Sequence, residues 1–341
     1  MNIDALNAIA RKMVAKGKGI LAADESSGTI KKRFDKIGVE STQDNRRDYR
    51  ELLFRSKEGM QHISGVILFD ETIRQKAKDG TPLVKLIEDA GAVPGIKVDA
   101  GAKPLAFSKG ETVTEGLDGL RERLMEYHKL GARFAKWRAT YDPTEGRPSY
   151  NCINANAQAL ARYAALCQEQ DIVPIVEPEV LMDGDNDIAA CSAVTEWALK
   201  ETFQQLYFAN VALEGMVLKP NMIISGLKCA KQASVEEVAD ETVKILKRCV
   251  PAAVPGIAFL SGGQSDEVAT AHLNAMNARH PNLPWALTFS YGRALQAAPQ
   301  KAWSGKTDNV PAAQSAFAHR ARMNGLATTG GWKTEMEKKA A

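Results

Sequence analysis

The sequence predicts a single (β/α)8 barrel, on three observations. Eight short apolar runs recur along the 341 residues, at the roughly 30–45-residue spacing of strand–helix units. Stretches with helical periodicity separate these runs, and no linker rich in Pro, Gly or Ser divides the chain. This alternation favours one barrel over two doubly wound halves, and an open sheet with accessory helices is the remaining alternative. We expect one domain over residues 1–341, with a helical C-terminal extension from about residue 301 to 341.

Each predicted strand is a short apolar or β-branched run that ends in charged residues, Ser or Gly. In chain order the eight runs are residues 19–24, 65–70, 94–99, 132–138, 173–179, 215–219, 256–261 and 285–290. Between them, residues 154–170 and 234–249 are predicted helices. The second of these begins with a capping box, Ser234 with Glu237, and its apolar residues recur with a helical period.

Composition narrows the class of protein. The chain is 45% hydrophobic and 25% charged, which is typical of a globular protein. A net charge of +3 is too small to indicate a nucleic-acid or anionic membrane partner. We expect no membrane span and no secretory signal, because long apolar runs are missing. The five scattered cysteines include no C-x-x-C pair, so we expect reduced thiols and a cytoplasmic protein.

Charged residues occur in pairs at the ends of three predicted strands. The pairs are Lys97 with Asp99, Lys136 with Arg138, and Glu177 with Glu179. Side chains two residues apart on a strand share a face, and buried charges are costly unless they serve a site. In a barrel the carboxyl ends of all strands meet at one mouth, so these pairs predict one pocket. A ring of mutually compensating ion pairs is the alternative.

One lysine in this pocket has the sequence context of a nucleophile. An ordinary lysine, with a pKa of about 10.4, is neutral in roughly one molecule in a few thousand at pH 7. Lys219 follows apolar residues and precedes Pro220, so burial and the nearby Lys136 are expected to lower its pKa. Neutral amines of this kind form Schiff bases with carbonyl carbons. Glu177 is a candidate general acid/base, and Asp24 can orient a substrate hydroxyl or accept its proton.

The turns after the last two strands predict anion binding. Residues 259–263 and 290–293 contain glycines, which let backbone N–H groups approach an anion, and barrels often hold phosphate at this place. Arg293 would complete that clamp, while Lys97 with Arg138 and Arg33 forms a second basic cluster. Two cationic sites suit a substrate with a phosphate at each end. The five histidines show no metal-ligand spacing, so we expect no metal cofactor.

At these residues the sequence resembles the class I fructose-bisphosphate aldolases. The similar motifs occur in the family's order, at residues 21–26, 97–99, 136–138, 176–179, 213–220, 259–263 and 291–296. The resemblance implies reversible cleavage of fructose 1,6-bisphosphate to dihydroxyacetone phosphate and glyceraldehyde 3-phosphate, through a lysine Schiff base and without a metal. It also implies a role in glycolysis and gluconeogenesis, and a homotetramer.

The resemblance assigns roles to individual residues. Lys219 is the Schiff-base lysine and Glu177 the principal acid/base. Asp24 acts at the carbon–carbon bond. The assisting residues are Glu179, Lys136 and Arg138. The residues expected at the C1 phosphate of the ketose are Ser261, Gly262, Gly292 and Arg293. Those expected at the other end are Lys97, Arg138, Arg33, Ser26 and Thr29.

One departure from the family pattern concerns the C-terminus. Animal and plant members similar to this chain end in a tyrosine that is linked to proton exchange at bound dihydroxyacetone phosphate, whereas the last tyrosine here is Tyr291. We therefore expect that tail chemistry to be absent or performed otherwise. The preference among fructose 1,6-bisphosphate, fructose 1-phosphate and sedoheptulose 1,7-bisphosphate stays open. A non-catalytic sugar-phosphate sensor is a further alternative, but it would be expected to lack Lys219, Glu177 or Asp24.

Overall fold

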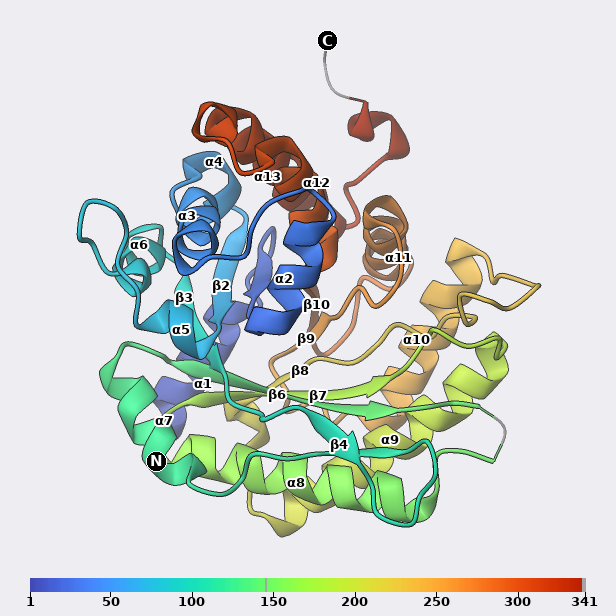
Figure 1. The fold of residues 1–341 in the computed structure, drawn as a ribbon. Helices are drawn as coiled ribbons and strands as arrows, with labels where there is room; N and C mark the ends of the chain where they lie inside the picture. The colour runs from blue at the N-terminus through green and yellow to red at the C-terminus, as the bar shows by residue number, and fades with distance from the viewer. Residues whose placement is uncertain (145, 339–341) are drawn as a thin grey trace.

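The computed structural model describes residues 1–144 and 146–338, and its centre is a closed barrel of parallel strands (Figure 1). The order around the barrel is β1-β2-β3-β6-β7-β8-β9-β10, and β10 pairs with β1. The barrel strands are β1 (Gly19–Ala23), β2 (Ile63–Leu68), β3 (Val93–Lys97), β6 (Phe134–Tyr141), β7 (Val173–Val180), β8 (Val217–Leu218), β9 (Gly256–Phe259) and β10 (Ala286–Tyr291). Each overlaps one of the eight predicted runs, with bounds that differ by up to three residues, so the barrel prediction is confirmed.

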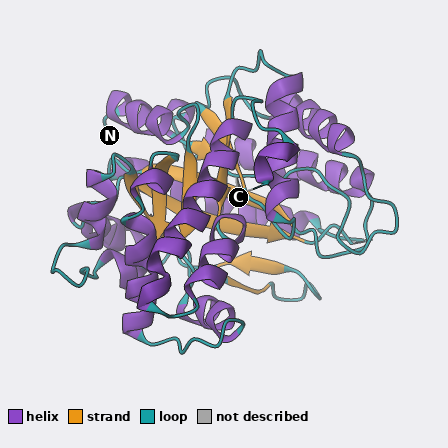
Figure 2. Ribbon diagram, turned by 90° about the horizontal axis from the view of Figure 1, so that it is seen from above, coloured by secondary structure: helices purple, strands orange, loops and turns teal. Residues whose placement is uncertain are grey.

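Helices surround the strands on the outside, as Figure 2 shows from above. The α-helices are α1 (Ile3–Met13), α2 (Ser27–Asp35), α3 (Gln43–Phe54), α4 (Lys57–Met60), α5 (Asp70–Ile73), α6 (Leu83–Asp89), α7 (Leu120–Lys129), α8 (Tyr150–Glu169), α9 (Ile188–Phe208), α10 (Val235–Cys249), α11 (Asp266–Arg279), α12 (Arg293–Trp303) and α13 (Val310–Ala327). Short 3-10 helices are η1 (Leu213–Gly215), η2 (Thr307–Asn309) and η3 (Thr334–Glu337). Within the described residues, none of these helices is long and apolar enough to cross a membrane.

The helix predicted at residues 234–249 is α10, and it forms for the expected reasons. The Ser234 hydroxyl accepts a hydrogen bond from the Glu237 N–H, and the Glu237 carboxylate accepts one from the Ser234 N–H. Its apolar face, which includes Val243 and Leu246, is buried, and the helix packs between α9 and α11. The capping box thus satisfies two backbone N–H groups that a helix start leaves free.

Apolar side chains fill the lower part of the barrel and close its amino end. Phe134 lies inside, and it fits because Gly95 on the neighbouring strand has no side chain; a Cβ there would lie 2.3 Å from the ring. Leu6 and Met13 of α1 belong to the same cluster, so α1 covers the amino end. With this end closed, the carboxyl end of the barrel is left open for a site.

Two parts of the chain differ from, or add to, the predicted pattern. The antiparallel pair β4 (Ala102–Pro104) and β5 (Thr112–Thr114) lies outside the barrel and was not predicted, because three-residue strands carry too few positions for a periodic signal. After α12, the chain forms α13, which packs on α12 and α4 (Figure 1). The expected helical extension is seen in α13 and in the short η3, with turn and coil at residues 328–333 between them; the end of the expected extension, residues 339–341, lies outside the described residues. The division into domains stays a prediction.

Candidate active site

A cavity of about 520 Å³ opens at the carboxyl ends of the barrel strands. The structure brings every predicted site residue to its wall. These residues are Asp24, Ser26, Thr29, Arg33, Lys97, Lys136, Arg138, Glu177, Glu179, Lys219, Ser261, Gly262, Gly292 and Arg293. They come from positions spread across most of the chain, and the barrel topology alone makes them neighbours.

The alternation of side chains along each strand explains why these residues face the cavity. On β6, Phe134 points into the barrel core, so Lys136 and Arg138, at steps of two, continue the same row upward. On β7, Ile175 occupies the core and Glu177 with Glu179 follows in the same way. Each strand thus carries apolar residues at its amino end and ionisable residues at its carboxyl end.

At the centre of the cavity, two lysines and two carboxylates form a chain of alternating charge. The Nζ of Lys136 lies 2.8 Å from Oδ2 of Asp24 and 3.5 Å from Oε2 of Glu177. The Nζ of Lys219 lies 3.2 Å from Oε1 of Glu177. Lys136, Lys219 and Glu177 are each exposed by 5% or less. Glu177 therefore bridges the two lysines in surroundings that screen charge poorly.

These contacts fix the protonation states of Asp24 and Lys136. Burial raises the pKa of Asp24, but the attraction of Lys136, Lys219 and Lys97 outweighs burial and holds the pKa well below its usual range. Burial likewise lowers the pKa of Lys136, but Asp24 and Glu177 outweigh it and the pKa is raised. Asp24 is thus a carboxylate and Lys136 an ammonium at neutral pH.

Three carboxylate oxygens of the cavity wall are buried and have no hydrogen-bond partner within the part of the chain that the structure describes: Oε2 of Glu25, Oε2 of Glu177 and Oδ2 of Asp99. The first two still face cations, Arg50 at 3.7 Å and Lys136 at 3.5 Å, whereas Oδ2 of Asp99 has no ion pair among the described residues. Buried polar atoms are normally paired, so an unpaired one in a cavity indicates a group that bonds to a ligand. Asp99 was among the charges that the sequence placed in the pocket.

One end of the cavity is built to bind an anion. Gly292 precedes the eleven-residue helix α12, whose start has no side-chain cap, so the N–H groups of its first two residues can point at a ligand. Arg293 begins this helix. In the turn after the neighbouring strand β9, Gly262 has φ of 55°, and a Cβ there would collide with the sulfur of Met182, so only glycine fits this turn.

At the other end, the basic groups are held by neighbours. The Lys97 ammonium lies 5.2 Å from the centre of the Phe69 ring, and the Arg138 guanidinium pairs with Glu179. The pKa of Arg138 is raised: burial lowers it, but the attraction of Glu179 and a hydrogen bond to it outweigh burial. Ser26 and Thr29, whose assignment to this end stays a prediction, also line the cavity; Ser26 caps helix α2, and its hydroxyl accepts a hydrogen bond from the Thr29 N–H.

The structure places Arg33 differently from the sequence-based grouping with Lys97 and Arg138. A Cβ built on Gly292 would lie 3.7 Å from Nη2 of Arg33, so this guanidinium lies beside the start of α12. The reason is tertiary: β1, which precedes helix α2, pairs with β10, which precedes α12. Arg33 is therefore a neighbour of the Arg293 end of the cavity.

Sequence reasoning missed several residues of the wall. Glu25 lines the cavity, pairs with Arg33 and accepts a hydrogen bond of 2.7 Å from Gln296. A strict alternation from Asp24 would turn Glu25 away from the barrel axis, but the strand ends at Ala23 and the chain bends there. The only available signal was a second carboxylate beside Asp24. Thr140 and Ser290 also line the cavity and are uncharged, so no charge pattern marked them.

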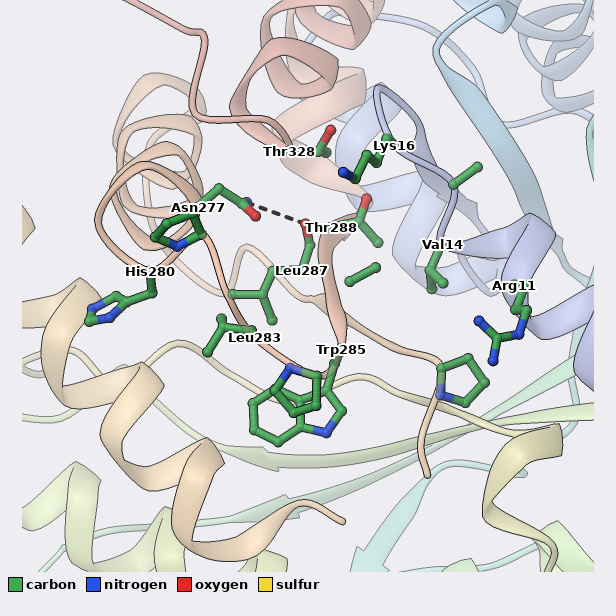
Figure 3. Close-up of a pocket in the computed structure, with 15 residues that line it drawn as sticks. Arg11, Val14, Lys16, Asn277, His280, Leu283, Trp285, Leu287, Thr288 and Thr328 are labelled. Atoms are coloured by element: carbon green, nitrogen blue, oxygen red, sulfur yellow. Dashed lines mark hydrogen bonds between the residues drawn. The ribbon is translucent and has the colours of Figure 1, made fainter. Parts of the chain in front are cut away.

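A second cavity, of about 340 Å³, lies at the opposite end of the barrel (Figure 3). Its wall includes Leu287 of β10 and Trp285 just before that strand, and Arg11 and Lys16 line it as well (Figure 3). The nearby imidazole of His280 lies 2.9 Å from Asp240. This cavity shares no wall residue with the first one, and it lies at the amino ends of strands, where barrels carry stability and not chemistry.

A (β/α)8 barrel with ionisable groups and an anion site at its mouth belongs to the class of barrel enzymes that act on phosphorylated substrates. Comparison with known proteins identifies the family. The family model described as fructose-bisphosphate aldolase class-I matches residues 5–341. The chain therefore belongs to the class I fructose-bisphosphate aldolase family, as the sequence resemblance predicted, and it is an aldehyde-lyase (EC 4.1.2.13). The function expected from the sequence, that of a class I fructose-bisphosphate aldolase, is therefore confirmed.

Individual relatives and a solved structure point to the same family. The chain is 60% identical to the probable fructose-bisphosphate aldolase class 1 of Xanthomonas campestris pv. campestris, over 98% of this chain and 100% of that protein. It is 54% identical to fructose-bisphosphate aldolase C of Carassius auratus, over 95% and 90% of the two chains. Among solved structures, fructose-bisphosphate aldolase from Plasmodium falciparum, crystallised with TRAP and a small-molecule inhibitor, superposes with a TM-score of 0.95 at 49% identity, over 97% and 96% of the two chains.

Proposed function

We propose that this aldolase cleaves fructose 1,6-bisphosphate reversibly to dihydroxyacetone phosphate and glyceraldehyde 3-phosphate through a Schiff base on Lys219, without a metal cofactor. The observation that carries the proposal is the buried Lys219 amine, 3.2 Å from Glu177 in a cavity with cationic groups at both ends. The two cationic ends favour a bisphosphate over fructose 1-phosphate. Comparing kcat/KM for fructose 1,6-bisphosphate, fructose 1-phosphate and sedoheptulose 1,7-bisphosphate tests this preference.

The surroundings distinguish the two buried lysines. Lys136 lies between Asp24 and Glu177, and its raised pKa keeps it an ammonium, which cannot attack a carbonyl. Lys219 contacts only Glu177 among the carboxylates of the described chain within ion-pair distance. It can therefore pass its proton to Glu177 and become the nucleophile, while Lys136 supplies positive charge.

The reaction begins at the ketose carbonyl. The neutral amine of Lys219 adds to C2 to give a carbinolamine, and Glu177 gives a proton to the leaving hydroxyl, so that water departs and an iminium forms. The C3–C4 bond then breaks, its electron pair moves toward the iminium to give an enamine, and Asp24 accepts the proton of the C4 hydroxyl. Glyceraldehyde 3-phosphate leaves, the enamine is protonated at C3, and water hydrolyses the iminium to release dihydroxyacetone phosphate and the free lysine.

The other wall residues hold the substrate. Ser261, Gly262, Gly292 and Arg293 supply N–H groups and a guanidinium for the phosphate on C1. Lys97 and Arg138, with Ser26 and Thr29, serve the phosphate at the other end, and Arg33 reaches toward the C1 side. Glu179 keeps the Arg138 guanidinium in place.

We further propose a cytoplasmic homotetramer that acts in glycolysis and gluconeogenesis. Tyr207 and Phe208, at the end of α9, are exposed by 77% and 62%, and apolar surface of this kind favours contact with a second copy. All five cysteines are free thiols, which suits a reducing compartment. Sedimentation of the wild type and of a Phe208→Ser variant tests the assembly, because a smaller species is expected for the variant.

Borohydride trapping tests the mechanism. Reduction in the presence of dihydroxyacetone phosphate should add a stable mass to the peptide that contains Lys219. Trapping on Lys136, or on no lysine, would contradict the assignment. A chelator should leave the rate unchanged, and a rate that is lost with chelator and restored by a divalent metal would contradict the metal-free mechanism.

A further inference from the structure

The turn between β9 and α11 carries a buried amide that the mechanism does not use. Gln264 is 4% exposed and does not line the active-site cavity. Its Nε2 donates to the Ser261 carbonyl at 3.0 Å, and its own N–H donates to the same carbonyl at 3.2 Å. Its main-chain carbonyl accepts a hydrogen bond from Nη2 of Arg293. Gln264 therefore joins the two segments that form the C1-phosphate end of the site.

A buried histidine holds this amide from behind. The Nδ1 of His272 lies 2.6 Å from Oε1 of Gln264, and the ring is 6% exposed on helix α11. Because Nε2 of Gln264 is already a donor, Oε1 is the acceptor and Nδ1 of His272 carries the proton. Burial lowers the pKa of His272 to about 4, so the imidazole is neutral at physiological pH and this tautomer is maintained.

We propose that Gln264 and His272 are positioning residues for the C1-phosphate end of the active site. His272 orients the Gln264 amide, and Gln264 in turn holds the Ser261–Gly262 turn and the Arg293 guanidinium at the spacing that a phosphate needs. Neither residue touches substrate. This inference rests on the proposed role of Arg293 and the turn in phosphate binding.

Changes at Gln264 or His272 should affect binding at the C1-phosphate end of the site and not at the other end. Loss of a buried hydrogen bond that orients a charge-assisted clamp is expected to weaken phosphate binding about tenfold. The effect should fall on dihydroxyacetone phosphate and on inorganic phosphate, but not on glyceraldehyde 3-phosphate, which binds at the other end. The rate at saturating substrate should change little, because Lys219 and Glu177 are untouched.

The test compares four variants with the wild type. His272→Leu removes the donor, and His272→Asn keeps one at the position of Nδ1, so Asn should restore binding. Gln264→Met removes the amide itself and serves where the Leu variant is unstable. Thr270→Val is the matched control, because Thr270 is fully buried on the same helix and its hydroxyl bonds to Asn324, Arg320 and the Asp266 carbonyl of its own helix, but not to Gln264 or Ser261.

Three measurements are made on each variant. The first is the dihydroxyacetone phosphate concentration that gives half-maximal borohydride trapping, the second is the Kd of inorganic phosphate by calorimetry, and the third is the KM for glyceraldehyde 3-phosphate. His272→Leu and Gln264→Met should raise the first two about tenfold, with undiminished maximal trapping and an unchanged third value, while His272→Asn and Thr270→Val stay within about twofold of the wild type.

Unchanged values in His272→Leu and Gln264→Met would overturn the inference. So would an equal rise in Thr270→Val, or an equal rise in the KM for glyceraldehyde 3-phosphate, because either would show a general loss of structure. If the wild type itself is not trapped, the Schiff-base proposal fails, and the Kd of inorganic phosphate still decides the role of Gln264 and His272.

Discussion

Lys219 and Lys136 show how the same residue type acquires different chemistry from its contacts. Both are buried in one cavity, but Lys136 has carboxylates on two sides and Lys219 on one. The carboxylates on two sides outweigh burial and raise the pKa of Lys136, which keeps this amine an ammonium. The sequence singled out both lysines and favoured Lys219, because apolar residues and a proline surround it.

Lys219→Ala should lower turnover at least about a thousandfold, because no other amine takes its position. Steady-state cleavage of fructose 1,6-bisphosphate measures this. Lys301→Ala, which changes an exposed lysine outside the cavity, should leave the rate unchanged. Near-normal turnover of the Lys219 variant would contradict the mechanism.

Arg293→Ala should raise the KM for fructose 1,6-bisphosphate about 10- to 100-fold with a small change in kcat, because a charge-assisted hydrogen bond to phosphate is lost. Arg279→Ala is the control, since Asp240 is the only hydrogen-bond partner of its side chain among the described residues and the pair lies on the surface. A fall in kcat at constant KM would instead show that Arg293 acts in the chemical steps.

The Asp24–Lys136 pair predicts a pH dependence of stability. The folded pKa of Asp24 lies below the unfolded value of about 3.8, so its contribution is present above that pH and is lost as the pH falls further. The difference in free energy of unfolding between the wild type and Asp24→Asn should therefore be constant from pH 7 to about 5 and shrink below about pH 4. Urea unfolding at several pH values measures it. A difference that grows on acidification would contradict the assigned direction.

At the scale of secondary structure, the alternation along strands and the caps of helices account for most of the fold. Steps of two from Phe134 and Ile175 lead directly to the charged wall of the cavity. This is why residues two apart, such as Lys136 and Arg138, could be assigned to one pocket from sequence. Alternation no longer predicts the direction of a side chain where a strand ends and the chain turns. Glu25 lies at such a place, and for this reason it was not predicted as part of the cavity wall.

Ser234→Ala should destabilise the protein by about 1 kcal/mol, because α10 loses its N-terminal cap. Urea denaturation measures the change in the free energy of unfolding. Ser234→Asn, which keeps a capping oxygen, should cost no more than a few tenths of a kcal/mol. Equal losses in both variants would show that the capping bond is not the cause.

At the scale of the whole molecule, the barrel separates stability from chemistry. Apolar side chains and α1 close the amino end, and the carboxyl end holds the ionisable groups. Gly95→Ala should destabilise the fold by about 1–3 kcal/mol, because the added Cβ would collide with Phe134 inside the barrel. Phe134→Leu in the same chain should recover part of that loss. If the double variant is no more stable than Gly95→Ala, the collision is not the cause.

The sequence by itself determined the barrel, its eight strands and most of the charged residues that line the cavity, because each depends on local periodicity and on which residue ends a strand. Only the tertiary structure decided that Arg33 lies beside Gly292, that Glu25 belongs to the wall, and that His272 supports Gln264 behind Arg293. These relations join side chains from different βα units. Their distances depend on barrel closure and on how helices pack across it, and no spacing along the chain encodes that geometry.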